Sequence, residues 1–176
     1  GGHWMTYDIA SKALQVAQYW QFRIEPFEAI PANPEDVWGE QLRGLLSQAV
    51  KRRLISDVPL GIFLSGGIDS SAVLAFATRH VPPREIKTFS IGFTEQSFDE
   101  SAYAQRMAAH FGSDHHHEVL SLEAVGDLAE EVLSMLDEPM GDSSILPTFL
   151  LCRFARKYVT VALGGDGGDE LFAGYD

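Results

Sequence analysis

The stretch LGIFLSGGIDSS, residues 60–71, decides the fold. Its first five residues form an apolar run that predicts a buried strand, and the Ser-Gly-Gly that follows predicts a loop. Ser70–Arg79 is apolar almost all round, which is typical of a helix packed against a sheet. The order of strand, glycine loop and helix indicates a unit of a parallel α/β sheet.

A second stretch repeats this order about a hundred residues later. Thr160–Leu163 predicts a strand that runs into Gly164-Gly165-Asp166-Gly167-Gly168-Asp169. Between the two stretches, the spacing of apolar residues predicts strands at 88–92 and 117–120 and helices near 103–111, 125–136 and 150–158. Strands that alternate with helices predict an α/β domain with a mostly parallel sheet, helices on both faces and right-handed crossovers.

The first 33 residues have a different pattern. Partly alternating apolar residues in 1–22 predict two short strands, too few for a domain, and we assign them to the end of an upstream domain. Prolines and the loss of periodicity mark a linker at 23–33. Asn33-Pro34-Glu35-Asp36 then predicts the start of a helix that continues to about Arg53. We therefore expect the α/β domain over 34–176, truncated at its C-terminal end.

The composition limits the classes of function. The 176 residues carry 13 Lys and Arg against 25 Asp and Glu, a net charge of −12, which opposes nonspecific binding of nucleic acid. The single cysteine excludes an internal disulfide, and no stretch has the layout of a membrane span or a signal peptide. We expect a cytoplasmic protein without nucleic-acid or membrane partners. Cys152 falls in a predicted helix, and we expect it in the core.

The two glycine loops predict one ligand site. Because ligands bind beyond the carboxyl ends of parallel strands, both loops are expected to open into the same crevice. In the first loop, two glycines permit a sharp turn with accessible amide groups. These amides, the neighbouring serine hydroxyls (Ser65, Ser70 and Ser71) and the next helix N-terminus form a cradle suited to phosphate.

The acidic residues of the loops predict a cation. Asp69 would repel phosphate unless a cation lay between them, and Mg²⁺ bound to oxygen ligands resolves the conflict. If the loops face one another, Asp69 and Asp169 share this metal, and Asp166 lies near the reacting centre. The alternative is that both loops are tight strand–helix turns whose acids only favour the helix N-termini.

Several segments resemble one family. SGGIDS at 65–70 resembles the SGGxDS pyrophosphate motif of ATP pyrophosphatases. The wider segments resemble the synthetase domain of glutamine-dependent asparagine synthetases: VPLGIFLSGGIDSS at 58–71, TFSIGF at 88–93, SFDES at 97–101, DEP at 137–139 and GDGGDELFAGY at 165–175. Residues 1–22 are similar to the last strands of that family's N-terminal glutaminase domain. The resemblance implies a Rossmann-like fold of the adenine nucleotide alpha hydrolase type.

The resemblance also implies a reaction and site residues. ATP activates a substrate carboxylate, aspartate first, as an acyl-adenylate with release of pyrophosphate, and glutamine-derived ammonia from an upstream glutaminase domain then displaces AMP. The residues implied to hold the pyrophosphate are Ser65, Gly66, Gly67 and Ser70. Those implied to bind Mg²⁺ are Asp69 and Asp169. Phe63 and Ile91 would contact the adenosine, Gly164 and Gly165 would close over the nucleotide, and Asp166 would be the base for the incoming amine.

Two positions depart from the family pattern. Well-known asparagine synthetases carry glutamate where Asp166 stands and serine where Gly164 stands, and the GDGGDE form also occurs in members that amidate other carboxylates. The identity of the acid therefore stays open, and the sequence leaves room for a homo-oligomer. Without the glutaminase nucleophile and a downstream lysine of the family, residues 1–176 alone are expected to bind ATP weakly. The alternatives are another ATP pyrophosphatase, acting on a nucleotide or tRNA, and a noncatalytic nucleotide-binding module.

Two further segments carry residues that could form sites. Consecutive residues of a strand point to opposite faces, so at most two of His115-His116-His117 could meet one ion, and we expect a strand rather than a metal site. Asp142-Ser143-Ser144 is expected to form a loop and helix cap, and the resemblance implies that it lies near the cleft.

Overall fold

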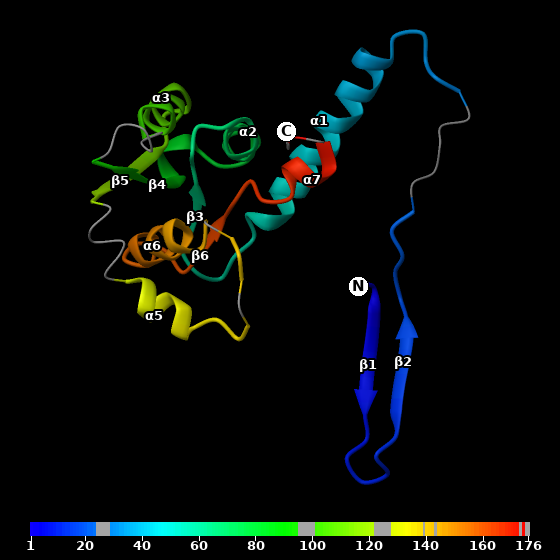
Figure 1. Ribbon diagram of the computed structural model, residues 1–176. Helices are drawn as coiled ribbons and strands as arrows, with labels where there is room; N and C mark the ends of the chain where they lie inside the picture. The colour runs from blue at the N-terminus through cyan, green and yellow to red at the C-terminus, as the bar shows by residue number, and fades with distance from the viewer. Residues whose placement is uncertain are drawn as a thin grey trace. The chain divides into compact units, whose positions relative to one another are not determined.

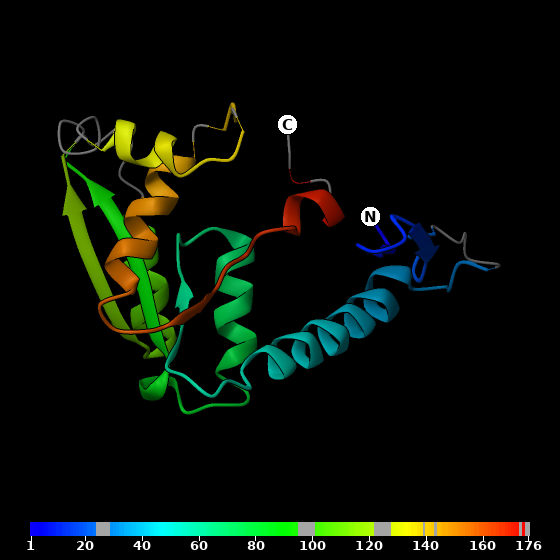
Figure 2. The same ribbon diagram turned by 90° about the horizontal axis from the view of Figure 1, so that it is seen from below.

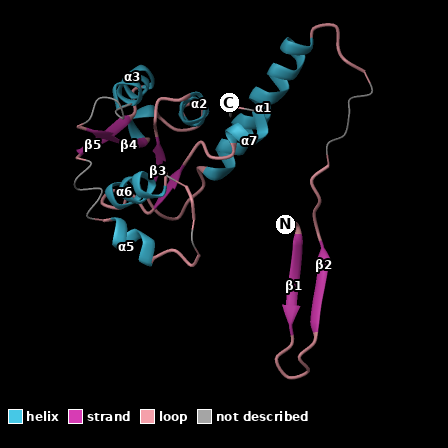
Figure 3. Ribbon diagram, in the orientation of Figure 1, coloured by secondary structure: helices cyan, strands magenta, loops and turns pink. Residues whose placement is uncertain are grey.

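The computed structural model describes residues 1–23, 29–94, 101–121, 128–138, 140–142, 144–172 and 174. Its elements are β1 (His3–Tyr7), β2 (Leu14–Gln18), α1 (Pro34–Arg53), β3 (Leu60–Phe63), α2 (Ile68–Ala77), the 3₁₀ helix η1 (Pro83–Glu85), β4 (Lys87–Phe93), α3 (Ser101–Phe111), β5 (Asp114–Leu120), α5 (Ala129–Ser134), α6 (Ile145–Ala155), β6 (Val161–Leu163) and α7 (Gly168–Phe172) (Figures 1 and 3). None of the helices in these ranges has both the length and the apolar character needed to cross a bilayer. The chain divides into two compact units, 1–39 and 40–176.

The N-terminal unit contains an antiparallel hairpin. β1 pairs with β2, with His3 opposite Gln18 and Tyr7 opposite Leu14, so the two predicted strands are confirmed. A two-stranded hairpin is at best marginally stable in water, and the large apolar side chains of this one are exposed, Met5 among them. Its assignment to an upstream domain, and the linker at 23–33, stay predictions. Residues 24–28 of that linker lie outside the described residues.

The second unit is built on a four-stranded sheet in the order β5-β4-β3-β6, with every pair parallel. β3 lies between β4 and β6, and Gly61 of β3 is opposite both Lys87 and Ala162. The chain therefore runs from β3 to β4 and β5 on one side of it, and later returns to place β6 on the other side of β3. This reversal places the two strands that precede the glycine loops side by side, which is where open α/β sheets bind ligands.

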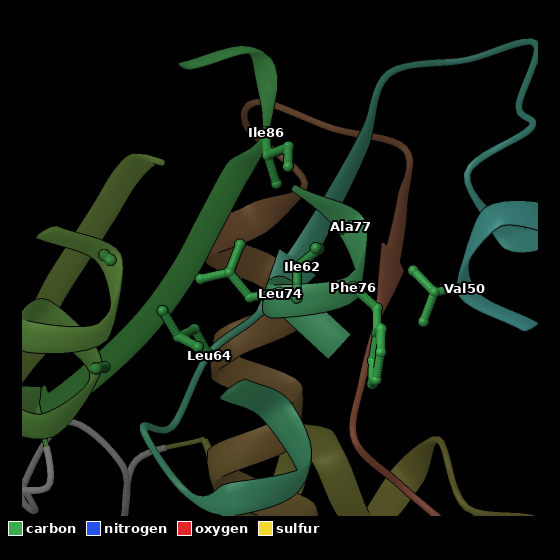
Figure 4. Packing of buried hydrophobic residues seen from close by; sticks show 9 residues of the cluster. Val50, Ile62, Leu64, Leu74, Phe76, Ala77 and Ile86 are labelled. Atoms are coloured by element: carbon green, nitrogen blue, oxygen red, sulfur yellow. The ribbon is translucent and has the colours of Figure 1, made fainter. Parts of the chain in front are cut away.

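Helices cover both faces of this sheet, as predicted (Figures 1 and 2). α2 and α3 pack on one face, where Ile62, Leu64 and Leu74 are almost completely buried (Figure 4). α6 packs on the other face, where Phe89 is fully buried against Phe154. Neighbouring residues of β3 and β4 alternate between these two cores, because side chains of a strand point to opposite faces in turn.

Some predicted boundaries and one predicted burial differ from the structure. β5 begins three residues earlier than predicted and contains all three consecutive histidines, and α6 begins at Ile145 rather than near 150. The first residues of the helix predicted at 125–136 lie outside the described residues. Cys152 lies in a helix, as predicted, but the prediction that it belongs to the core is wrong, because it is exposed. α6 buries Leu150 and Phe154, four residues apart on one face, and Cys152 falls between them on the opposite side.

Candidate functional site

A cleft of about 840 Å³ lies at the carboxyl ends of β3, β4 and β6. Both glycine loops, the end of β4 and the first turns of α6 form its walls. All the site residues implied by the sequence line it except Gly66: Phe63, Ser65, Gly67, Asp69, Ser70, Ile91, Gly164, Gly165, Asp166 and Asp169. The structure thus brings the two loops to one site. Ser71 is not part of the wall, and its buried Oγ has no hydrogen-bond partner within the part of the chain that the structure describes.

The first loop is held by hydrogen bonds between its own serines. Ser65 Oγ and Ser70 Oγ are 2.9 Å apart, and the Ser65 amide donates to Ser70 Oγ at 3.2 Å. The Gly67 amide donates to Ser65 Oγ at 3.2 Å. This amide, one of those expected to bind phosphate, is therefore already satisfied within the loop, and the Ser65 hydroxyl must rotate before Gly67 can donate to a ligand.

Gly66 shapes the loop rather than lining the cleft. Its φ of +84° is in the left-handed region, which side-chain-bearing residues rarely adopt. A Cβ at this position would also lie 2.5 Å from the Cβ of Tyr103 and 2.6 Å from the amide nitrogen of Ala104. Two independent constraints therefore require glycine at 66, and the loop is packed directly against the first turn of α3.

The N-terminus of α2 faces the cleft without a side-chain cap. Its N-cap residue is Gly67, and among the described residues no side chain forms a capping hydrogen bond there. The unpaired amide groups of a helix start carry partial positive charge and bind anions. Ser70, in the same first turn, lines the cleft although only 7% of its surface is exposed. The start of α2 is thus suited to phosphate oxygens.

The second loop meets the first at the start of α2. A Cβ on Gly165 would lie 2.8 Å from the Ser70 amide nitrogen and 2.9 Å from Asp69 Cβ. A Cβ on Gly168 would lie 2.5 Å from both Cγ and Oδ2 of Asp69. The Asp69 carboxylate therefore lies against the residue that immediately precedes Asp169. Because Gly168 of the second loop has no side chain, the Asp69 carboxylate of the first loop can lie against it, and the two loops pack closely together.

The cleft has a strongly acidic wall. Within the described part of the chain, every charged residue that lines it is acidic: Asp69, Asp142, Asp166, Asp169 and Glu170. Such a wall repels a free polyphosphate, whereas a divalent cation held by carboxylates attracts one. No three His, Cys, Asp or Glu side chains among the described residues form a ready-made metal cage. A Mg²⁺ held by Asp69 and Asp169 would therefore take its other ligands from phosphate and water.

The first turns of α6 and the residues just before them also line the cleft, which the sequence indicates only indirectly. Asp142, Ser144, Thr148 and Leu151 line the cleft there. Asp142 Oδ1 accepts a hydrogen bond of 2.8 Å from the Ser144 amide, which lowers the pKa of Asp142 below its ordinary value. The expected loop thus lies at the cleft. Ser144 is the N-cap residue of α6, but no side-chain capping hydrogen bond is present among the described residues, and Ser143 lies outside them.

The three consecutive histidines support the sheet beside the cleft. His115 Nε2 and His117 Nδ1 lie 3.2 and 3.0 Å from the hydroxyl of Ser90, which lines the cleft, and His115 Nδ1 lies 2.9 Å from Thr88 Oγ1. His116 points to the opposite face and stacks on Phe89. Burial, and then the neighbouring histidines, lower the pKa of His115. Their hydrogen bonds to β4 side chains agree with the predicted strand.

Comparisons with known proteins connect this cleft with one family. The family model described as asparagine synthase matches residues 41–176. A putative glutamine-hydrolysing asparagine synthetase 2 of Methanocaldococcus jannaschii is 37% identical over 171 residues, which are 97% of this chain and 32% of that protein. The glutamine-hydrolysing asparagine synthetase 1 of Bacillus subtilis is 39% identical over 142 residues, 81% of this chain and 22% of that protein. The chain thus spans about a third or less of these relatives.

A solved structure shares the fold. The glutamine-dependent NAD⁺ synthetase of Acinetobacter baumannii, in complex with ADP, matches with a TM-score of 0.54 and 19% identity. The match covers 98% of this chain and 31% of that one. At this identity the likeness concerns the fold alone, and it agrees with the parallel sheet and the helices on both of its faces.

Proposed function

Because this chain belongs to the asparagine synthase family, we propose that it provides the ATP site of an enzyme that converts a carboxylate into an amide. One observation carries the proposal: the Asp69 carboxylate of the first loop lies against Gly168 of the second, directly before Asp169. If each acid only stabilised the N-terminus of its own helix, the two loops would not need to lie against one another. Two acids that grip one cation must come from adjacent loops, as these do.

The reaction has two steps. An oxygen of the substrate carboxylate attacks the α-phosphorus of ATP, the bond from that phosphorus to pyrophosphate breaks, and an acyl-adenylate forms. Ammonia then attacks the acyl carbon, the bond to AMP breaks, and a proton leaves the nitrogen. Mg²⁺, when bound, offsets the charge that builds on the phosphates.

The residues of the first loop bind and orient the nucleotide in this proposal. The start of α2, with Ser65 and Ser70, receives the pyrophosphate oxygens, and Asp69 and Asp169 hold the Mg²⁺. The fixed position of the loop between α2 and α3 supplies alignment, which is a large part of catalysis in phosphoryl and nucleotidyl transfer. Gly66 and Gly67 contribute by allowing the turn and by offering amide groups.

The remaining residues act on the adenosine and on the acyl group. Phe63 and Ile91 line the cleft from adjacent strands and provide apolar contact for the adenosine. Gly164 and Gly165 close over the nucleotide from the second loop. Asp166 is exposed at the cleft wall, and it accepts the proton that the attacking amine loses.

The partners of the reaction belong to the same proposal. Ammonia comes from a glutaminase domain upstream, of which residues 1–22 would be the last strands. Aspartate is the first candidate for the acid, because the relatives are named asparagine synthetases. Another carboxylate is the second candidate, because Asp166 and Gly164 differ from the residues that resemblance leads us to expect. The cytoplasm is the expected location.

The decisive measurement is pyrophosphate release by the full-length protein with a panel of carboxylic acids, aspartate first. We expect release that depends on one acid and on Mg²⁺. Release with none of the acids would contradict amide formation, and release that depends on a nucleotide or tRNA instead would favour the other ATP pyrophosphatases.

The metal assignment has its own test in equilibrium binding of ATP with and without Mg²⁺. D69N should remove most of the gain in affinity that Mg²⁺ provides, because it replaces a charged ligand of the cation by a neutral one. Asp57, an exposed acid outside the cleft, supplies the matched control D57N, which should bind like the wild type. Unchanged Mg²⁺ dependence in D69N would show that Asp69 is not a ligand.

A further inference from the structure

A network of polar side chains connects β4 with β5 on the face of the sheet that α2 and α3 cover. Thr88 lies opposite His115 and Ser90 lies opposite His117, so alternate residues of the two strands bring all four side chains to one face. Ser113 Oγ is 3.0 Å from Thr88 Oγ1, which is 2.9 Å from His115 Nδ1. Ser90 Oγ is 3.2 Å from His115 Nε2 and 3.0 Å from His117 Nδ1. The hydrogen bonds therefore form an unbroken series from Ser113 to His117.

The packing of the sheet does not by itself require this network. Thr88 is fully buried and only 4% of Ser90 is exposed. Buried polar groups destabilise a protein unless they are hydrogen-bonded, and the net gain from each bond is modest, so an apolar pair would serve the core as well. Ser90 differs from the other four residues because it also lines the cleft. The network thus connects a cleft residue to the interior of the sheet.

The Ser90 hydroxyl has a hydrogen-bonding position left for a ligand. A hydroxyl has one proton and two lone pairs, and the two imidazole nitrogens use two of these three positions among the described residues. The remaining position is the proton if both rings donate to Ser90, and a lone pair if Ser90 donates to one ring. Burial lowers the pKa of His115, and its neutral ring has one donor nitrogen, so its bonds to Thr88 and Ser90 have a common direction.

The place of Ser90 in the cleft favours the nucleoside as that ligand. In the proposed function the phosphates lie at the loop after β3, and Mg²⁺ lies between this loop and the loop after β6. β4 is the neighbour of β3 on the side away from β6, and Ser90, Ile91 and Phe93 line the cleft there. A nucleotide whose phosphates occupy the loops places its nucleoside over β4. The ring nitrogens, amine and ribose hydroxyls of adenosine include both donors and acceptors, which suits either direction of the Ser90 hydroxyl.

We infer that the Ser90 hydroxyl binds the nucleoside of ATP and that His117 is a positioning residue that acts through Ser90. The inference rests on the proposed function, and it adds a polar contact to the apolar contacts from Phe63 and Ile91. His117 lies directly opposite Ser90 in the strand register, and its Nδ1 restricts the rotation of the hydroxyl.

The test compares a ligand that has the nucleoside with one that lacks it. Calorimetric titration of the full-length protein gives the Kd for Mg·ATP and for Mg·tripolyphosphate, which carries the same three phosphates. S90A should raise the Kd for Mg·ATP about five- to tenfold, the effect of one hydrogen bond, and leave the Kd for Mg·tripolyphosphate within about twofold. Ser47 supplies the matched control, because it forms a hydrogen bond of 3.0 Å with His80 outside the cleft, and S47A should leave both constants unchanged.

The positioning role has its own variants. H117L removes the ring nitrogens and should raise the Kd for Mg·ATP about threefold, again without an effect on Mg·tripolyphosphate. Because His117 acts through Ser90, S90A/H117L should have the constants of S90A within about twofold. The side-chain amide of H117N can occupy the place of Nδ1, so this variant should bind Mg·ATP within about twofold of the wild type.

These outcomes separate the inference from the proposed function. If the wild type binds neither ligand, the proposed function fails and the inference falls with it. If the wild type binds both, the inference alone is overturned by wild-type binding of Mg·ATP in S90A, by an equal loss for both ligands, or by a further loss in the double variant. Urea unfolding shows whether each variant is folded, and S90C, which keeps the volume of the side chain, replaces S90A if alanine prevents folding.

Discussion

Alanine at position 165 would wedge the two glycine loops apart. Its Cβ would lie 2.8 Å from the Ser70 amide nitrogen, 2.9 Å from Asp69 Cβ and 3.0 Å from the Asp69 carbonyl carbon. These atoms belong to the backbone of α2 or are fixed to it, so no side-chain rotation relieves the contact. Ordinary contact begins at 3.4 Å. The loops must therefore separate by about 0.6 Å.

The separation has a cost in both stability and binding. Inserting a methyl group into a packed site costs about 1–3 kcal/mol. If the loops part only in the nucleotide-bound form, where Asp69 and Asp169 must hold one cation, the same energy weakens Mg·ATP binding about 5- to 150-fold. Calorimetric titration of the full-length protein with Mg·ATP measures the loss of affinity. Urea unfolding of the same samples measures the loss of stability, so the two measurements show how the cost is divided between binding and folding.

The matched control is G44A. Gly44 lies inside α1 with open space around its Cβ position, so alanine there should leave Mg·ATP affinity unchanged and stabilise the helix by up to about 1 kcal/mol. If G165A binds Mg·ATP like the wild type and unfolds at the same urea concentration, the close fit of the loops has no energetic consequence. The shared-cation proposal would then lose its structural basis.

Two further predictions concern the core and the pH dependence of stability. L74A removes a side chain that is 0% exposed between α2 and the sheet, and it should lower the free energy of unfolding in urea by about 2–5 kcal/mol. L74M keeps most of the side-chain volume and should lower it by less than about 1.5 kcal/mol. Equally small losses in the two variants would contradict the close packing of Leu74. Burial lowers the pKa of His115 below its ordinary 6.5, so the unfolded chain binds more protons than the folded protein, and stability should fall as the pH drops below about 6.5. H115N should flatten that part of the urea-unfolding profile, and an unchanged slope would show that His115 does not cause it.

The parts of the fold that the sequence predicts well are those fixed by local chemistry. The apolar run before each glycine loop predicts a buried strand of a parallel sheet, and the structure has β3 and β6 there. β3 is largely buried as predicted, whereas β6 lies at the edge of the sheet and is half-exposed, so its predicted burial is wrong. The sharp turn of the first loop is also predictable, because consecutive glycines between a strand and a helix favour such a turn. Adjacency of the two strands follows from the rule that ligand loops meet where strand order reverses.

The parts that the sequence misses depend on how elements cross in space. Leu151 and Thr148 line the cleft because α6 packs against β4, and no periodicity within α6 encodes which strand it packs against. Cys152 appears apolar enough for the core, yet the face that α6 buries is set by Leu150 and Phe154. The hydrogen bonds of His115 to β4 depend on the register between two strands, which their separate sequences do not state.

Three glycines of the two loops differ in what excludes a side chain, and this difference orders their expected effects. Gly66 and Gly165 are limited by backbone atoms of α3 and α2, so substitution there disturbs the fold of the loops as well as any ligand. Gly168 is limited by the Asp69 carboxylate, so substitution should act first on the cation. Glycine-rich loops are usually treated as uniform phosphate cradles, but here Gly66, Gly165 and Gly168 each make room for a different group. The effects of single alanine variants on unfolding and on the Mg²⁺ dependence of ATP binding should therefore separate by position, and a uniform response would mean that the loops act only through their flexibility.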